Sequence, residues 1–364
     1  MPPPKLAPRV VRVEIARTEV SSPALAELFG IERLPLAQAD VEIEIDGVPT
    51  AVVNALRRVA TDEMPGVCLD VGPGGFDFAS TTDPFQSESY VVGRLRLIPL
   101  VPGIPAEQAE TLRLRLDMTN ETTADLSIYS GDLEVVAGAM PEPLFNPTYK
   151  ITTLGAGKRI VMNDIRITTG YGHEHGAYIV ACRAAFKHLD LEEHPHDETH
   201  KPGGAAVDLS GYKLSCLVAD PRHHLFTASL PATGPNLADI RTVFADACAN
   251  IKERLRAIAA AVAAYQAAGT SRGIQYTVIQ LEGGLFEAVV LVPGETHTIG
   301  ELLRRMVFEH VPEISNVAYS IVPHENRLKL SMRHVEDITD TFAEVIQSTI
   351  RVFDTLQSGI SSAR

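Results

Sequence analysis

The sequence of 364 residues has no tryptophan and only four cysteines, and features that define several common protein classes are missing from it. Cys68, Cys182, Cys216 and Cys248 form no CxxC pair, so a disulfide framework is not expected and a reducing compartment fits. The longest apolar run, Ala257 to Tyr265, is too short to span a bilayer. The first residues, MPPPKLAPRVV, lack the apolar core of a secretory signal. We therefore expect an intracellular protein that does not associate with membranes.

Positive charge is also scarce. The chain has 32 Lys and Arg against 46 Asp and Glu, which gives a net charge of −14. Binding to nucleic acid is driven largely by Lys and Arg side chains that neutralise phosphates, and no dense basic run exists here. The balance argues against a free-standing nucleic-acid-binding protein and favours partners with basic surfaces.

The usual catalytic motifs are absent as well. The sequence contains no P-loop, no G-x-G-x-x-G and no nucleophile elbow. GPGGF, at residues 72–76, is rich in glycine but lacks the Lys-Ser/Thr that completes a phosphate-binding loop. We interpret GPGGF as a turn.

Histidines are the one group that suggests a metal. They cluster in HPHDETH (residues 194–200), in GHEHG (His173 and His175) and at His223-His224. A zinc site needs three or four convergent ligands, and Pro195 breaks the helical spacing that an HExxH motif requires. We interpret HPHDETH as part of an exposed loop and GHEHG as structural. A metal-dependent enzyme or metal-binding protein that uses these clusters is the alternative.

What the sequence does contain is the same order of elements at each end. VVRVEIARTEV and DVEIEIDGVP alternate apolar and polar residues, which predicts two strands. A helix follows, with Val52, Val53, Leu56 and Val59 on one face. IQYTVIQLEGG and FEAVVLVPG repeat the pattern before a second helix, and a long amphipathic helix closes each copy. The sequence predicts an α+β protein with two like units, the first interrupted by a β-rich module.

The two short helices share a motif. NALRRVATDEMP (Asn54–Pro65) and ELLRRMVFEHVP (residues 301–312) match at a Leu, two Arg, an acidic residue (Asp62 and Glu309) and a terminal Pro. Neighbours on a helix point about 100° apart, so one Arg of each pair can face a partner while the other faces the sheet edge. Solvated helix charges are the alternative, but the recurrence of the pair favours contacts with carboxylates of a partner.

The first copy and its surroundings resemble a known family. NALRRVATDEMPGVCLDV, followed further on by GRLRLIPL, is similar to the signature of the α-like subunits of multisubunit RNA polymerases. These are bacterial α, archaeal D and the third-largest subunit of eukaryotic RNA polymerase II. TADLSIYSGDLEV resembles a strand pair of their inserted domain, and GKRIVMNDIRITTGYGHEHGAY resembles the return to the dimerisation domain. FTASLPATGPNLADIRTVFADACANIKERL resembles the family's final strand and helix.

The C-terminal part resembles the smaller partner of that subunit, archaeal L or the eleventh subunit of RNA polymerase II. The resemblance implies two dimerisation-type units that form a pseudo-dimer within one chain, similar to fusions that large nucleocytoplasmic DNA viruses encode. The D-like unit is expected at residues 9–65 and 157–266, with a β-rich insert at 66–156. A linker is expected at 267–273 and the L-like unit at 274–364.

Function is implied by the same resemblance. The chain is expected to be a non-catalytic assembly subunit of a DNA-directed RNA polymerase, without cofactor or metal. It also lacks the aspartate triad by which polymerase active sites hold Mg²⁺. The expected partners are the largest and second-largest subunits and small subunits of the same platform, with the first motif facing the second-largest subunit and the second motif the largest. The host cytoplasm (a viral factory), the nucleus and the virion all stay open as the location.

Two sets of residues follow from this interpretation. The partner interface is expected at Asn54, Arg57, Arg58, Arg94, Arg96, Arg304 and Arg305. The core between the two units is expected at Ile240, Phe244, Ile251, Leu255, Ile258, Phe342, Ile346, Ile350 and Phe353.

The sequence also departs from the family. Ser89, Gly93 and Arg96 stand where relatives have an acidic residue, His and Gly before the LIPL segment. Residues 101–150 contain no cysteine, so the zinc or iron–sulfur site of many relatives is not carried over.

Overall fold

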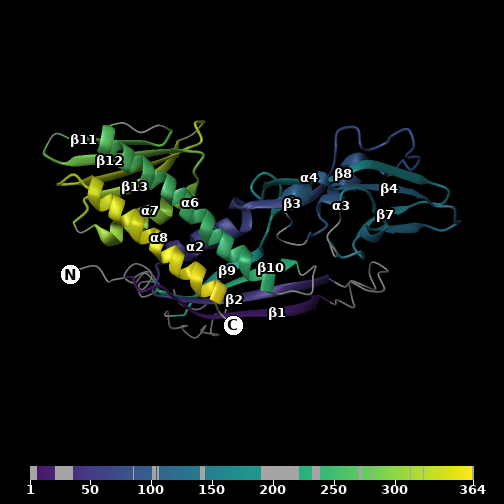
Figure 1. Ribbon diagram of the computed structural model, residues 1–364, viewed down its shortest axis with the longest axis horizontal. Coiled ribbons are helices and arrows are strands. Elements are labelled where there is room, and N and C mark those ends of the chain that lie inside the picture. The colour runs from purple at the N-terminus through teal and green to yellow at the C-terminus, as the bar shows by residue number, and fades with distance from the viewer. Residues whose placement is uncertain are drawn as a thin grey trace, which may run out of the picture.

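The computed structural model describes residues 6–20, 36–84, 86–100, 104, 106–139, 144–189, 221–231, 238–269, 273–281, 283–311, 313–322 and 324–362. Two groups of elements are visible in Figure 1. One holds two sheets and the long helices, and the other is a β-rich module at the opposite end of the long axis. Helices and strands are both abundant, which confirms the α+β class.

The first sheet joins strands that lie far apart in the sequence. Its order is β1-β2-β10-β9, and all pairs are antiparallel. The strands are β1 (Arg9–Val20), β2 (Leu36–Asp46), β9 (Cys182–His188) and β10 (His223–Pro231). Alternation in β2 buries Val41, Ile43 and Ile45 while the residues between them stay partly exposed. The two N-terminal strands predicted from this alternation are confirmed.

The second sheet has the same internal order as the first. Its order is β11-β12-β14-β13, again antiparallel, so in both sheets the first, second, fourth and third strands lie side by side. The strands are β11 (Gln275–Gln280), β12 (Phe286–Pro293), β13 (Asn316–Val322) and β14 (Arg327–His334). In each case a short helix follows the second strand and a long helix follows the fourth. These helices are α2 (Thr50–Arg58) and α7 (His297–His310), then α6 (Ala238–Ala268) and α8 (Thr339–Ser362).

Helices α6 and α8 run antiparallel and side by side (Figure 1). Lys252 Nζ lies 2.6 Å from Asp354 Oδ1, and Gln266 donates to Asp340. Residue numbers therefore increase along α6 in the direction in which they decrease along α8. Each helix also reaches the other sheet. Tyr265 of α6 packs its ring against Tyr276 of β11. On α8, a Cβ at Gly359 would lie 2.7 Å from Val10 of β1, so a side chain there would force helix and strand apart.

The predicted core residues lie along the facing sides of these two helices. All whose side chains are described are less than a tenth exposed and belong to one continuous core that takes residues from both sheets. They are Phe244, Ile251, Leu255, Ile258, Phe342, Ile346, Ile350 and Phe353. The side chain of Ile240 lies outside the described set.

The β-rich module has a core of its own. Its main sheet has the order β3-β8-β4-β6, and β5 pairs with β7 in a small second sheet. The main strands are β3 (Pro65–Val71), β4 (Arg113–Thr119), β6 (Glu134–Ala137) and β8 (Arg159–Tyr171). The other elements are β5 (Leu126–Tyr129), β7 (Lys150–Leu154), α3 (Glu88–Arg96), α4 (Ala106–Thr111) and the short 3-10 helix η2 (Ser130–Asp132). A second 3-10 helix, η3 (Gly176–Tyr178), follows β8 and packs against β3.

Three details of the module go beyond what the sequence patterns indicated. The first four residues of GRLRLIPL complete helix α3. The strands β5 and β6 on either side of Ser130-Gly131 form, yet each pairs with another strand because η2 turns the chain between them. Strand β8 pairs with β3 from Val71↔Ile165 to Pro65↔Tyr171, so residues 159–171 form part of the module's sheet. HPHDETH (residues 194–200), interpreted as part of an exposed loop, lies outside the described residues.

Candidate functional site

Helices α2 and α7, which carry the doubled arginines, pack against each other between the two sheets. Their apolar faces hold them there, since Val52, Val53 and Leu56 on α2 are buried and so are Leu302, Leu303 and Met306 on α7. Helix α2 then continues into a π-helical turn, η1 (Val59–Glu63), whereas α7 runs to His310 without one. The two copies of the motif therefore meet in space but end differently.

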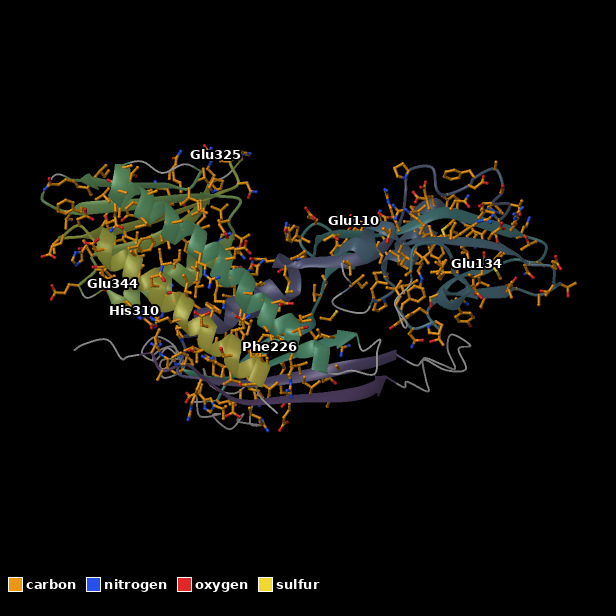
Figure 2. The ribbon with its side chains drawn as sticks, in the orientation of Figure 1. Glu110, Glu134, Phe226, His310, Glu325 and Glu344 are labelled. Atoms are coloured by element: carbon orange, nitrogen blue, oxygen red, sulfur yellow. The ribbon has the colours of Figure 1, made fainter. Side chains whose placement is uncertain are left out.

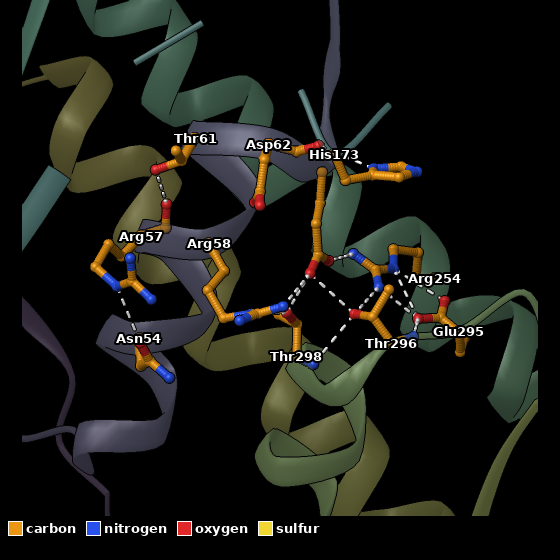
Figure 3. A network of polar contacts seen from close by, with 11 residues as sticks. Asn54, Arg57, Arg58, Thr61, Asp62, His173, Arg254, Glu295, Thr296 and Thr298 are labelled. Carbon is orange, nitrogen blue, oxygen red and sulfur yellow. Dashed lines mark hydrogen bonds and ion pairs between the residues drawn. The ribbon is translucent and has the colours of Figure 1, made fainter. Parts of the chain in front are cut away.

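The first arginine of each pair bonds back along its own helix. Arg57 Nε donates to Asn54 Oδ1 at 3.0 Å, and Arg304 Nε donates to Glu301 Oε2 at 2.7 Å. Both partners lie three residues earlier, at the same position of the motif. Arg57 points away from the polar network on the other side of α2 (Figure 3). These two arginines are thus placed alike on the outer sides of their helices.

The second arginine of the first pair points into a polar network that joins η1 to α6 and to the start of α7 (Figure 3). Arg58 Nε donates to Thr298 Oγ1 at 2.7 Å, and its terminal nitrogen lies 3.2 Å from Glu63 Oε1. Glu63 stands at the end of η1, and its side chain is only 5% exposed. The π-helical turn brings it against residues that follow β12.

Arg254 of α6 completes this network from the other side. Its terminal nitrogen donates to Glu63 Oε2 at 2.8 Å, and its Nε donates to Glu295 Oε1 at 2.9 Å. Thr296 and Thr298 add hydroxyl donors to Glu63 Oε1. Two carboxylates and two guanidinium groups therefore meet in a little-exposed space, and most of their hydrogen-bonding groups are satisfied.

The hydrogen bonds and charges around Glu63 and Arg254 decide the ionisation of these two side chains. Burial works to raise the pKa of Glu63, but the hydrogen bonds from Thr298 and Arg254 and the charge of Arg254 outweigh it, so the pKa lies below its ordinary value. Burial works to lower the pKa of Arg254, and the contacts with Glu295 and Glu63 outweigh it, so that pKa is raised. Both groups are thus held in their charged forms.

A matching network surrounds the second arginine of the other pair. Arg305 Nε lies 2.9 Å from Glu309 Oε1, and Arg222 places two nitrogens on the same carboxylate at 3.0 and 3.1 Å. Glu309 is 8% exposed, much like Glu63. The Arg-to-Glu step is four residues in α7 and five in α2, because the π-helical turn adds one residue. The counterpart of Glu309 is therefore Glu63, and the alignment of Asp62 with Glu309 is corrected by the structure.

Arg94 and Arg96 lie on α3, in the module. Arg96 holds Asp70 with two nitrogens at 2.9 Å each, and Arg94 donates to the carbonyl of Lys150. The mutual contact raises the pKa of Arg96. Both arginines thus brace α3 against the module's strands, at a distance in sequence and fold from the two motif helices.

The described histidines of the predicted clusters, with His188, make contacts within the fold. His173 Nδ1 lies 3.2 Å from the carbonyl of Asp62, and the side chain of His175 accepts from the amide of Ala177. His223 contacts Glu44 at 2.7 Å, and His224 is buried against His188. Within the described ranges, no group of His, Cys, Asp or Glu could hold a metal ion. HPHDETH lies outside them.

Sequence reasoning missed Glu63, Arg254 and Glu295. A signal for Arg254 was present, because it lies three residues after Ile251 and four before Ile258, on the apolar side of α6. A charged residue at such a position needs a buried partner. Glu295 and Thr296 precede a helix, where acidic and hydroxyl residues are common, and so gave no such signal.

As the pH falls, the stability of the wild-type protein is expected to decrease more steeply than that of the Glu63→Gln variant. The folded-state pKa of Glu63 lies below its ordinary value of 4.5, so the ionised carboxylate stabilises the fold above that pH. This contribution is lost as the pH falls through the lowered pKa, and glutamine does not titrate. Urea midpoints between about pH 5 and about pH 3 measure the difference. Equal slopes for the two proteins would contradict it.

Comparison with known proteins identifies the family. The DNA-directed RNA polymerase RPB3-11 homolog of African swine fever virus is 34% identical over 344 residues, which is 93% of this chain and 92% of the relative. That of the Badajoz strain is 33% identical over the same shares. The polymerase subunit Rpo3 of Pyrobaculum aerophilum is 33% identical over 158 residues, 39% of this chain and 56% of that protein. No protein-family model matches the sequence.

The viral and the archaeal relatives are both subunits of DNA-directed RNA polymerase, so the chain is related to that class of protein. It belongs to the family of RPB3-11 homologs, which confirms the expected fusion of an α-like subunit with its smaller partner. Among the described helices, none has the length and hydropathy that crossing a membrane requires.

Proposed function

We propose that this chain is the non-catalytic assembly subunit of its RNA polymerase and holds the two largest subunits together. The observation that carries this is the pairing of two units with the same strand order through one continuous core, which presents the doubled-arginine motif twice. A rigid body with two similar outer surfaces suits the joining of two large partners. The proposal places the chain inside the host cell, where the polymerase meets its template.

The internal arrangement is part of the proposal. We propose an intramolecular pseudo-dimer, with residues 274–364 as the second unit. The linker expected at 267–273 is shortened at its start, because helix α6 runs to Ala268. The pairing of β8 with β3 supports an insert that runs from 66 to 171 rather than to 156. The first unit then consists of residues 9–65 and of the chain from 172 to 266. Joining the units raises their effective concentration to about the millimolar range, which favours assembly.

The partner surfaces are proposed at the outer arginines. Arg57 with Asn54 is assigned to the second-largest subunit, and Arg304 with Glu301 to the largest. The inner arginines, Arg58 and Arg305, form ion pairs with Glu63 and Glu309 and are proposed to hold the two motif helices in place. Other small subunits are expected to bind the same platform.

Charge reversal at the outer arginines tests the proposal. When the chain is co-expressed with the two largest subunits, Arg57→Glu is expected to weaken retention of the second-largest subunit about tenfold, because a charge-assisted hydrogen bond is worth about 1.5–3 kcal/mol. Arg304→Glu is expected to do the same to the largest subunit. Quantitative mass spectrometry of the purified complex measures both.

Arg351→Glu is the matched control, since this arginine is exposed on α8. It is expected to leave the composition of the complex unchanged. The proposal fails if the wild-type chain neither co-purifies with the two largest subunits nor promotes their association. Equal loss of both subunits in either variant would instead contradict the assignment of one motif to each.

A further inference from the structure

A groove of about 720 Å³ separates helix α6 from the neighbouring end of the β-rich module. One wall comes from β3, from the C-terminal end of α3 and from the η3 region, and the other comes from α6. Gly66 lines it, and a Cβ at this position would lie 2.0 Å from the carbonyl oxygen of Tyr178. Only glycine allows β3 and η3 to approach closely enough to form this wall.

The α6 wall is polar and acidic. Asp246, Ala249, Asn250 and Glu253 line the groove, and their spacing places them on one face of the helix. Asp246 and Glu253 are exposed, and neither has an ion-pair partner among the described residues. The Oδ1 atom of Asn250 is buried and accepts no hydrogen bond from the described part of the chain. Within the described part of the chain, this face thus carries two carboxylates without an ion pair and one acceptor without a hydrogen bond.

The opposite wall is apolar. Leu97 is 61% exposed and Ile179 is 38% exposed, although both are large aliphatic residues. Further apolar side chains continue the wall, namely Met64, Ile98, Leu100, Ile104 and Val180. Exposed aliphatic side chains gathered beside polar ones are typical of a surface that a protein partner covers.

The charge of the groove selects its occupant. Arg96 is the one cationic residue in the described lining, and the Asp70 carboxylate already neutralises it. The net negative charge from Asp246 and Glu253 opposes nucleic acid and other anions. A small hydrated cation would leave the apolar wall uncovered. A peptide segment with apolar side chains on one side and a basic side chain on the other satisfies both walls.

We propose that this groove binds a segment of another subunit of the polymerase, with large apolar side chains against Leu97 and Ile179 and a lysine or arginine facing Asp246 and Glu253. The inference rests on the proposed function, because it takes the partner from the same complex. A backbone or side-chain N–H of that segment donates a hydrogen bond to Asn250 Oδ1. The apolar wall supplies the buried area, and the carboxylates fix the register and orientation.

The test uses the polymerase assembled by co-expression and isolated through its largest subunit. A photo-crosslinking amino acid at Leu97 is expected to capture one smaller subunit, and the captured segment is expected to contain apolar residues and a lysine or arginine. The same group at Val136, which is 63% exposed on β6, is the control and is not expected to capture that segment.

Charge reversal gives the second readout. Asp246→Lys with Glu253→Lys is expected to lower the amount of that subunit in the complex about tenfold, while this chain and the two largest subunits stay together. Glu110→Lys with Glu134→Lys, at two labelled positions of the module, is the matched control (Figure 2). Changing the captured basic residue of the partner to glutamate is expected to restore its retention in the lysine variant.

The outcomes separate this inference from the proposed function. An unchanged composition in the lysine variant, or crosslinks to nucleic acid, to this chain or to a second copy of it, would overturn the groove assignment alone. A wild-type chain that fails to associate with the two largest subunits would overturn the proposed function and the partner assigned here along with it.

Discussion

Replacing Glu63 with alanine is expected to lower the free energy of unfolding by about 3 kcal/mol, near the lower end for removing one partner of a buried ion pair. The carboxylate receives hydrogen bonds from Arg58, Arg254, Thr296 and Thr298. Removing it takes one acceptor away from each of these part-buried guanidinium and hydroxyl groups. Arg254 keeps Glu295, which limits the loss.

Urea denaturation of the purified chain measures this effect. Asp62→Ala is the matched control, because Asp62 is the preceding residue and its described contact is made by its backbone carbonyl. Its effect is expected to stay within about 0.5 kcal/mol. Glu63→Gln keeps one acceptor and is expected to fall between the two. If the Glu63→Ala protein were as stable as the control, the network would not stabilise the packing of η1 against α6 and α7.

The network also shows why the doubled motif could be recognised from the sequence while its inner contacts could not. Two arginines beside a leucine recur at the same helical position, and the structure places Arg57 and Arg304 alike. The partner of Arg58 depends on a π-helical turn, a local change of one residue that no periodic pattern in VATDE predicts. An alignment without gaps therefore matched Asp62 to Glu309.

Strands and long helices were predictable because their periodicity reflects burial. Val41, Ile43 and Ile45 alternate on β2, and Ile251, Leu255 and Ile258 follow the helical repeat of α6. Pairing between strands is not encoded in this way, since it depends on residues far apart in the chain. For that reason the extension of the module's sheet along β8 to Tyr171 was not apparent from the sequence.

Replacing Phe353 with alanine is expected to destabilise the part of the chain that holds the two sheets and the long helices. The expected loss is about 3–5 kcal/mol, the usual cost of truncating a buried aromatic side chain. Phe353 lies on α8, is fully buried and belongs to the core that takes residues from both sheets. Because α8 also crosses β1 of the first sheet, the cavity is expected to weaken both units rather than its own alone.

Amide hydrogen exchange distinguishes a shared loss from a local one. Strands β2 and β12 lie in different sheets, and a loss of about 3 kcal/mol is expected to speed exchange of the protected amides in both by about a hundredfold or more. The module's sheet rests on a separate core, so protection of β4 is expected to change little. Phe308→Ala, at a side chain 56% exposed on α7, is the control.

The two possible results bear directly on how the chain works. Equal loss of protection in β2 and β12 would mean that the two sheets and their helices unfold together, which the proposed role of holding two large partners in fixed relation requires. Loss confined to β12 would mean that each unit is stable alone and that α6 and α8 only join them. The shared core, the antiparallel helices and the two ion networks between the units favour cooperative unfolding.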